Sequence, residues 1–123
     1  MKEQIFAALA AHTAWKERLY KAIDSGIIDP PPSVIELDNA CVFGKWLYGN
    51  EIPAAIKLTA QYEAVRQIHA QFHKLTAQIA LLAVTGNKEK AKELLSDGSE
   101  YIQLSDRLRS ALLDLARVSQ TLM

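Results

Sequence analysis

Apolar residues recur every three or four positions along most of this chain, which is the spacing of a buried helix face. The first such stretch consists of Ile5, Ala8, Leu9, His12, Trp15, Leu19, Ala22 and Ile23. Gly26 follows it, and a glycine in the left-handed conformation commonly ends a helix. Three prolines, Pro30 to Pro32, come next, so the sequence predicts an extended linker over residues 27–35.

The middle of the chain predicts one short helix and one long helix. The short helix covers about residues 36–48 and carries the only cysteine, Cys41, and Gly49 marks its end. The long helix begins near Pro53, which suits a first helical turn, and it continues to about Thr85. Its inner face carries Tyr62, Val65, His69, Phe72, Ile79 and Leu82.

A final helix is predicted over about residues 88–122, with apolar residues repeating every seven positions. The repeat consists of Tyr101, Leu104, Leu108, Ala111, Leu115, Val118 and Leu122. This repeat is typical of helix bundles, and Gly98 interrupts the segment before it, so we expect a kink or a restart there. No strand-like alternation occurs. Three long helices and one short helix therefore predict an all-α fold, an antiparallel four-helix bundle.

Length and charge narrow the class of protein. A chain of 123 residues fits a single domain, residues 1–123. Its 14 basic and 14 acidic residues cancel, so the basic face of a nucleic-acid-binding protein is not expected. We find no signal-peptide pattern and no apolar run of about 18 residues that would span a membrane. A single cysteine excludes an intrachain disulfide and suits a reducing compartment, so we expect a cytoplasmic protein.

The three histidines and the cysteine are the strongest candidates for chemistry. His69 and His73 are four residues apart, which places both imidazoles on one face of a helix. His12 lies on the apolar face of the first helix, and Cys41 lies on the short helix. One thiolate and three imidazoles suit tetrahedral zinc. Spacing alone leaves a second interpretation open, in which the histidines are hydrogen-bonded core residues and the cysteine is a small apolar residue.

The residues around Cys41 resemble the signature of the chemoreceptor zinc-binding (CZB) domain family of bacteria. In that signature a cysteine is followed by Phe43, Gly44 and Trp46 at the spacing found here. The resemblance continues, in order along the chain, through the following residues: His12, Trp15, Lys16, Leu19, His69 to His73, Gly98, Ser99, Leu104, Ser105 and Leu108. It implies a four-helix bundle with one zinc ion per chain, whose ligands here would be His12, Cys41, His69 and His73.

The resemblance also implies a sensory or regulatory module. Members of the family respond to zinc or to oxidants and are joined to chemotaxis receptors or to diguanylate cyclases, which produce cyclic di-GMP. Cys41 is the ligand that an oxidant can remove, because thiolates oxidise to sulfenic acid. No output domain fits in this length, so the chain is either a stand-alone regulator or a part of a larger receptor or cyclase. If it stands alone, we expect a protein partner or a second copy of the chain, in a homodimer, to carry the signal.

Three alternatives from other classes remain. A helical interaction module in which zinc only stabilises the fold would have the same ligands and no sensing role. An enzyme with Cys41 as nucleophile would need an oxyanion-hole motif, which we do not find. A di-iron bundle would need carboxylates at Glu-x-x-His spacing, and none is present. We therefore expect no enzyme activity.

The remaining motif residues have structural interpretations. Phe43 and Trp46 are expected to pack the short helix against the bundle. Gly44 costs about 1 kcal/mol relative to alanine inside a helix, which indicates either a close backbone approach or a plain packing role. Asp38 lies three residues before Cys41. It would accept a hydrogen bond from a ligand imidazole, cap the short helix, or be solvated.

Overall fold

The computed structural model describes residues 1–122 of the chain. Within them the structure is helical, and no strand occurs, which confirms the predicted all-α class. The helices are α1 (Lys2–Ser25), α2 (Pro32–Ile35), α3 (Val42–Leu47), α4 (Ala54–Lys57), α5 (Ala60–Val84), α6 (Lys88–Leu94) and α7 (Glu100–Leu122).

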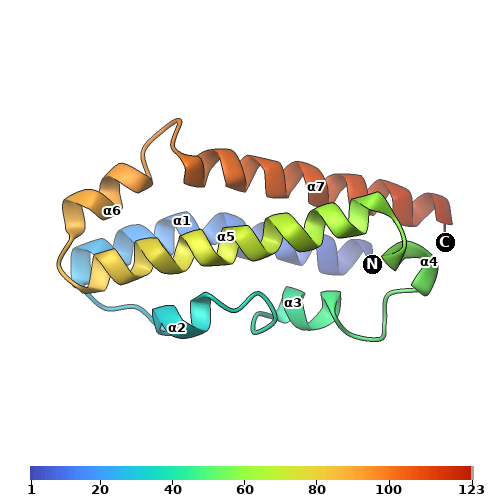
Figure 1. Cartoon of the computed structure of the whole chain (residues 1–123), viewed down its shortest axis with the longest axis horizontal. Helices are drawn as coiled ribbons and strands as arrows, with labels where there is room; N and C mark the ends of the chain where they lie inside the picture. Colours follow the sequence, from blue (N-terminus) through green and yellow to red (C-terminus); the bar gives the residue numbers. More distant parts are fainter. Residues whose placement is uncertain (123) are drawn as a thin grey trace.

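Four passes of the chain run along the bundle in alternating directions (Figure 1). The long helices α1, α5 and α7 make three of them, and α6 continues the line of α7 beyond a bend. The segment that contains α2, α3 and α4 makes the remaining pass, in which short helices alternate with loops. Helix α5 contacts α1, α2, α4, α6 and α7. Side chains on its inner face can therefore meet residues from every other pass.

Glycines end the helices where the sequence predicts breaks. Gly26 has a φ of 75° and donates its N–H to the Ala22 carbonyl, which closes α1. Gly98, with a φ of 77°, lies between α6 and α7. The predicted restart near this residue is confirmed, and it separates the short α6 from the long α7.

The short helix is shorter than the prediction of about 36–48. It covers Val42–Leu47, and Cys41 precedes it in an extended conformation, with φ −77° and ψ 162°. The reason is local, because the Gly44 N–H donates to the Cys41 sulfur at 3.3 Å. The cysteine side chain thus takes the N-cap position, where side-chain acceptors satisfy the free N–H groups of the first turn.

Two other helix boundaries differ from prediction. The proline-rich linker contains one helical turn, α2, because Pro32 can occupy the first position of a helix without losing a hydrogen bond. The long helix near Pro53 is divided into α4 and α5. Thr59 causes the division, since its hydroxyl accepts the N–H of Tyr62 at 3.1 Å and so starts α5 anew.

The apolar core fills the space between the passes. On α7 the buried residues are Tyr101, Leu104, Leu108, Ala111, Leu112, Leu115, Ala116 and Ser119. The predicted repeat of seven is followed through Leu115, after which the buried stripe moves to Ser119, and Leu122 is 50% exposed. A straight helix with 3.6 residues per turn drifts in this way from a repeat of seven.

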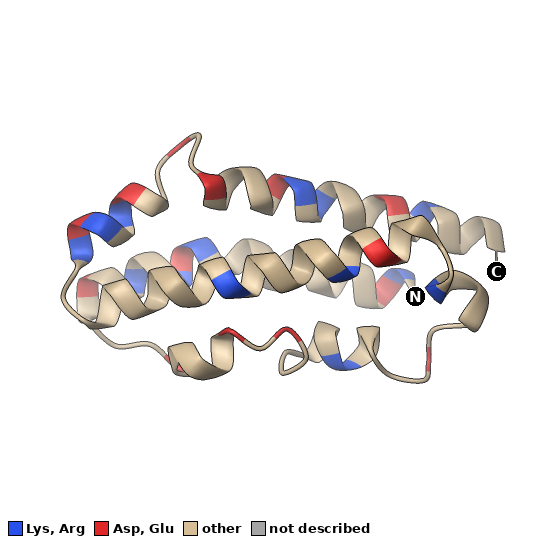
Figure 2. Cartoon of the chain, viewed as in Figure 1, with Lys and Arg blue, Asp and Glu red and all other residues tan. Residues whose placement is uncertain are grey.

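Charged residues of both signs lie on each long helix and on α6 (Figure 2). No pass of the bundle carries basic residues alone, which agrees with the balanced composition. Among the described helices, none is long and apolar enough to cross a membrane.

Candidate metal centre

The four predicted metal ligands come together inside the bundle. His12 comes from α1, Cys41 from the start of α3, and His69 and His73 from adjacent turns of α5. Their ligand atoms all lie within 4.8 Å of one another. The three imidazoles are buried, with His69 fully enclosed, and Cys41 is partly exposed. Four side chains that are up to 61 residues apart in sequence, His12 to His73, thus form one cluster.

The Nε2 atoms face a common point. The Cys41 sulfur lies 3.6 Å from Nε2 of His69 and 3.6 Å from Nε2 of His73. Nε2 of His12 lies 3.1 Å from Nε2 of His69. Three nitrogens and one sulfur therefore surround a small space in the bundle core.

Backbone carbonyls orient two of the three imidazoles. Nδ1 of His12 lies 2.7 Å from the Ala8 carbonyl oxygen, and Nδ1 of His73 lies 2.8 Å from that of Ile35. A carbonyl oxygen only accepts hydrogen bonds, so each Nδ1 donates its proton. The free lone pair of each ring is then on Nε2, which points into the cluster.

Burial keeps these imidazoles neutral. It lowers the pKa of His12 to about 4, against a smaller opposing effect of the hydrogen bond to Ala8. Burial also lowers the pKa of His73, with the bond to Ile35 opposing it. Neutral imidazole is the form that binds metal ions, so both rings are ready as ligands at neutral pH.

The outer side of the His69 ring, at Nδ1, is held by packing rather than by a hydrogen bond. Its Nδ1 is buried and has no hydrogen-bond partner within residues 1–122. Phe43 meets the ring edge to face with 5.1 Å between the ring centroids, and it also lies 6.0 Å from the His12 ring. Burial lowers the pKa of His69 to about 2, and the neighbouring His73 and His12 add to the effect. Phe43 therefore does more than pack α3, since it also positions two imidazoles.

The environment of Cys41 favours the thiol form unless a cation is present. Burial raises the pKa of the thiol, while the N–H of Gly44 lowers it to a smaller extent. Binding of a metal ion requires the thiolate and releases the proton. The sulfur is thus the group of the four whose protonation state depends most on an ion.

Gly44 permits the loop before α3 to fold back on the helix. A Cβ at this position would lie 1.8 Å from the Asp38 carbonyl oxygen. No side chain larger than hydrogen fits, so a close backbone approach explains this glycine. The contact keeps the loop that ends at Cys41 against the first turn of α3.

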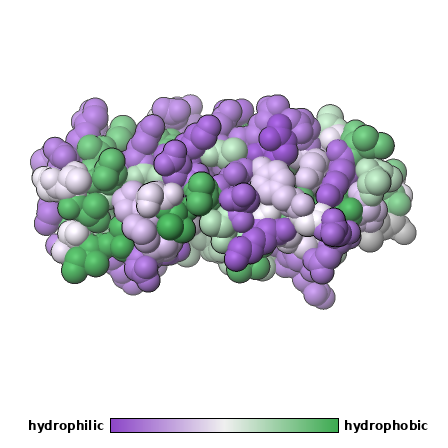
Figure 3. Space-filling view, turned by 60° about the horizontal axis from the view of Figure 1, so that its bottom comes forward, coloured by the Kyte–Doolittle hydropathy of each residue, from purple (hydrophilic) through white to green (hydrophobic). Residues whose placement is uncertain are grey.

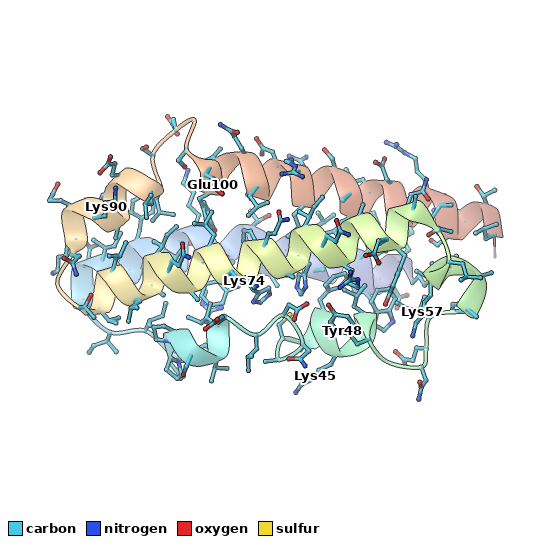
Figure 4. All side chains as sticks on the ribbon, in the orientation of Figure 1. Lys45, Tyr48, Lys57, Lys74, Lys90 and Glu100 are labelled. Atoms are coloured by element: carbon cyan, nitrogen blue, oxygen red, sulfur yellow. The ribbon has the colours of Figure 1, made fainter. Side chains whose placement is uncertain are left out.

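Asp38 does not accept a hydrogen bond from a ligand imidazole, which was one of the roles expected from the sequence. Its carboxylate accepts a hydrogen bond from the hydroxyl of Tyr48, which joins the two ends of the α3 segment. Its negative charge also raises the pKa of His73, although no hydrogen bond joins them. Tyr48 lies at the end of α3, and Lys45 projects away from the bundle on the outer side (Figure 4).

The donor set fits zinc. Imidazole nitrogen and cysteine sulfur are the ligands that zinc prefers in tetrahedral sites, and the Nε2 lone pairs of His12 and His73 are already free to bind it. The buried, unpaired Nδ1 of His69 is also in keeping with a ring whose Nε2 faces the centre.

We did not predict from the sequence that the backbone carbonyls of Ala8 and Ile35 orient the His12 and His73 rings. For Ala8 a signal was available, since it lies four residues before His12 on the same helix face.

The fold and the cluster define a helical domain with a candidate three-histidine, one-cysteine metal centre. A family model, the chemoreceptor zinc-binding domain, matches residues 12–80 of the chain. Because the match covers more than half of the chain, the protein belongs to this family, and the resemblance found in the sequence is confirmed. The matched range begins at His12 and contains Cys41, His69 and His73. Neither the curated proteins nor the solved structures gave a match.

Proposed function

We propose that this domain, residues 1–123, binds one zinc ion through His12, Cys41, His69 and His73. The observation that carries the proposal is the convergence of four ligand atoms within 4.8 Å in the core of a CZB domain. The Ala8 and Ile35 carbonyls support it, because they fix the ring nitrogens that face the centre.

The four ligands determine what a zinc ion would do in this domain. A bound zinc ion supplies a positive charge that stabilises the Cys41 thiolate, and four protein ligands leave no open position for a water nucleophile. His12, Cys41 and the two α5 histidines hold α1, the α3 segment and α5 together at one point. A site of this kind suits a structural or sensory role rather than hydrolysis.

We propose that the role is sensory and that Cys41 is the ligand that changes. The sulfur lies at the end of a loop, is partly exposed, and begins a helix of six residues. A peroxide can transfer one oxygen to the thiolate, which forms sulfenic acid and leaves water or an alcohol. Depletion of zinc acts on the same sulfur by favouring its thiol. Either event removes the attachment of segment 36–48 to α5 that passes through the metal, while the hydrogen bond from the Tyr62 hydroxyl to the Leu47 carbonyl remains.

The output of this change would be read by another protein. We propose a chemotaxis or cyclic di-GMP signalling partner in the cytoplasm, or a second copy of the chain in a homodimer. The single thiol suits a reducing compartment, and the CZB family is a chemoreceptor family. A purely structural zinc is the second candidate, and the complete burial of His69 favours it.

Metal analysis of purified protein tests zinc binding. We expect one zinc per chain, and loss of most of it in Cys41→Ala and His69→Ala. Lys45→Ala serves as a matched control, because Lys45 lies on α3 but projects into solvent. A zinc-free wild type, or full zinc content in the two ligand variants, would overturn the proposal.

Hydrogen exchange separates the sensory role from the structural role. One equivalent of peroxide per zinc should release zinc and increase exchange in residues 36–48 well before α7 changes. Unchanged exchange in that segment, with zinc retained, would favour the structural zinc.

A further inference from the structure

An apolar cavity of about 500 Å³ lies between α1 and the chain from Pro30 to Trp46. We call it the slot. Ala7 and Ala11 of α1 form one wall, and Val34, Leu37 and Val42 form much of the other. Volumes of about 300–1,000 Å³ are typical of small-molecule sites. Figure 3 shows the face that carries this segment, on which hydrophobic surface is interspersed with hydrophilic surface.

The slot exists because the second pass of the bundle is not a continuous helix. Residues 36–41 form a loop, and the α1 residues opposite are alanines that do not fill the space. The apolar residues at the rim are exposed, with Leu37 at 49% and Val42 at 87%. Exposed apolar residues clustered around a cavity indicate a binding site.

Polar groups lie at the two ends of the slot. Arg18 lies at one end, with its guanidinium 3.7 Å from the Trp15 ring centroid and a 2.9 Å hydrogen bond to the Asp29 carbonyl. It forms no ion pair with any residue of the described chain, 1–122. Glu3 and Gln4 lie at the other end, where the acidic Glu3 disfavours an anion, and the Oε1 atom of Gln4 is buried without a hydrogen-bond partner in residues 1–122. At 1.5 Å per residue, Gln4 and Arg18 are about 21 Å apart along α1.

These features specify the chemistry of an occupant. The apolar interior of the slot favours an apolar molecule, and the distance between its two ends favours an elongated molecule. Arg18 is fixed by stacking and has donors to spare, so it favours a carboxylate, which a guanidinium binds with paired hydrogen bonds. A helix of a partner protein does not fit inside, since a cylinder about 10 Å wide and 20 Å long occupies roughly 1,600 Å³.

We propose that the slot binds an aliphatic carboxylate of fatty-acid type, with the carboxylate at Arg18 and the chain along Ala11 and Ala7. The slot also borders His12, Cys41 and His73. A bound chain covers the accessible side of the cysteine and contacts the loop that carries it. The domain then has a second input, a lipid-like molecule, next to its metal centre.

Calorimetric titration of zinc-loaded protein with dodecanoate, below its micelle concentration, tests the proposal. We expect saturable binding of one molecule per chain, and at least tenfold weaker binding of decyltrimethylammonium, which has the opposite charge. Arg18→Gln should remove this preference for the anion. Lys21→Gln is the control, since Lys21 lies on α1, is exposed and does not line the slot.

Filling the slot gives the second arm of the test. Ala11→Trp should weaken dodecanoate binding at least tenfold, whereas Ala10→Trp, at an exposed position outside the slot, should leave it unchanged. Ala7→Trp replaces Ala11→Trp if that variant does not fold. Zinc content is measured for every variant, so that loss of the metal centre is distinguished from loss of the slot.

Three results would overturn the inference. The first is the absence of saturable dodecanoate binding to protein that retains its zinc. The second is an anion preference that survives in Arg18→Gln. The third concerns the oligomeric state. If the wild type is a dimer that Ala11→Trp converts to monomers, and dodecanoate does not change that dimer, then a second copy of the chain covers the slot.

Discussion

Replacement of Gly44 by alanine changes the contact that holds the cysteine loop against α3. The new Cβ would lie 1.8 Å from the Asp38 carbonyl oxygen, 2.8 Å from its carbon and 2.9 Å from Cα of Asn39. Ordinary van der Waals contact begins at 3.4 Å. Every clashing atom belongs to the backbone, so rotation of a side chain cannot relieve the overlap. The loop must move away from the helix by more than 1 Å.

The opposing contributions can be compared. Alanine favours the helix by about 1 kcal/mol over glycine, whereas overpacking costs about 1–3 kcal/mol or more when the backbone must shift. The hydrogen bond from the Gly44 N–H to the Cys41 sulfur, worth about 1 kcal/mol, is lost with the movement. We expect metal-free Gly44→Ala to lose about 2 kcal/mol of stability. Displacement of the sulfur should weaken zinc binding about 10–100-fold, as for other groups that orient metal ligands.

Two measurements check this expectation. Urea unfolding of metal-free protein gives the stability difference, and competition with a chelator gives the zinc affinity. Lys45→Ala is the matched control on the same helix, and it should change neither quantity beyond about 0.5 kcal/mol. A Gly44→Ala protein with wild-type stability and wild-type zinc affinity would refute the argument that the close approach to Asp38 positions Cys41.

Three further predictions concern the same region. Tyr62→Phe removes the buried hydroxyl that donates to the Leu47 carbonyl at 2.7 Å and should lower stability in urea by about 1–3 kcal/mol, whereas the exposed Tyr20→Phe should not. Metal-free protein should lose stability as pH falls below about 6.5. The folded chain holds the pKa of His12 near 4 and that of His69 near 2, so at pH 5 to 6 the unfolded chain binds protons that the folded chain does not. The slope reaches about 1.4 kcal/mol per pH unit for each buried histidine, and a flat profile between pH 7 and 5 would contradict it. Chelation of zinc should raise hydrogen exchange in residues 36–48 more than in α7, and equal increases in both would argue against a local attachment.

The fold was predictable wherever a local pattern determines it. The spacing of apolar residues gave α1, α5 and α7, because each long helix buries one face. Gly26 and Gly98 marked breaks that the structure confirms, since both adopt positive φ. The bounds of α3 were not predictable in the same way. They depend on the hydrogen bond from the Gly44 N–H to the Cys41 sulfur. The spacing of apolar residues does not reveal a side-chain cap of this kind.

The residues of the candidate site were predicted from their spacing together with the resemblance around Cys41, whereas their orientation could not be predicted. The sequence has three histidines and one cysteine, and the structure brings all four together. The role of Ile35 depends on how the segment after the prolines folds, since its carbonyl reaches His73 only once α2 packs against α5. The hydrogen bond between Asp38 and Tyr48 also depends on tertiary structure, because the loop that carries Asp38 must first fold against the end of α3.

The most direct measurement is a crystal structure of zinc-loaded protein with anomalous scattering recorded on both sides of the zinc absorption edge. We predict one peak per chain, about 2.0–2.1 Å from Nε2 of His12, His69 and His73 and about 2.3 Å from the Cys41 sulfur. A peak elsewhere in the chain, or a zinc ion at this place whose ligands do not include Cys41, would contradict it.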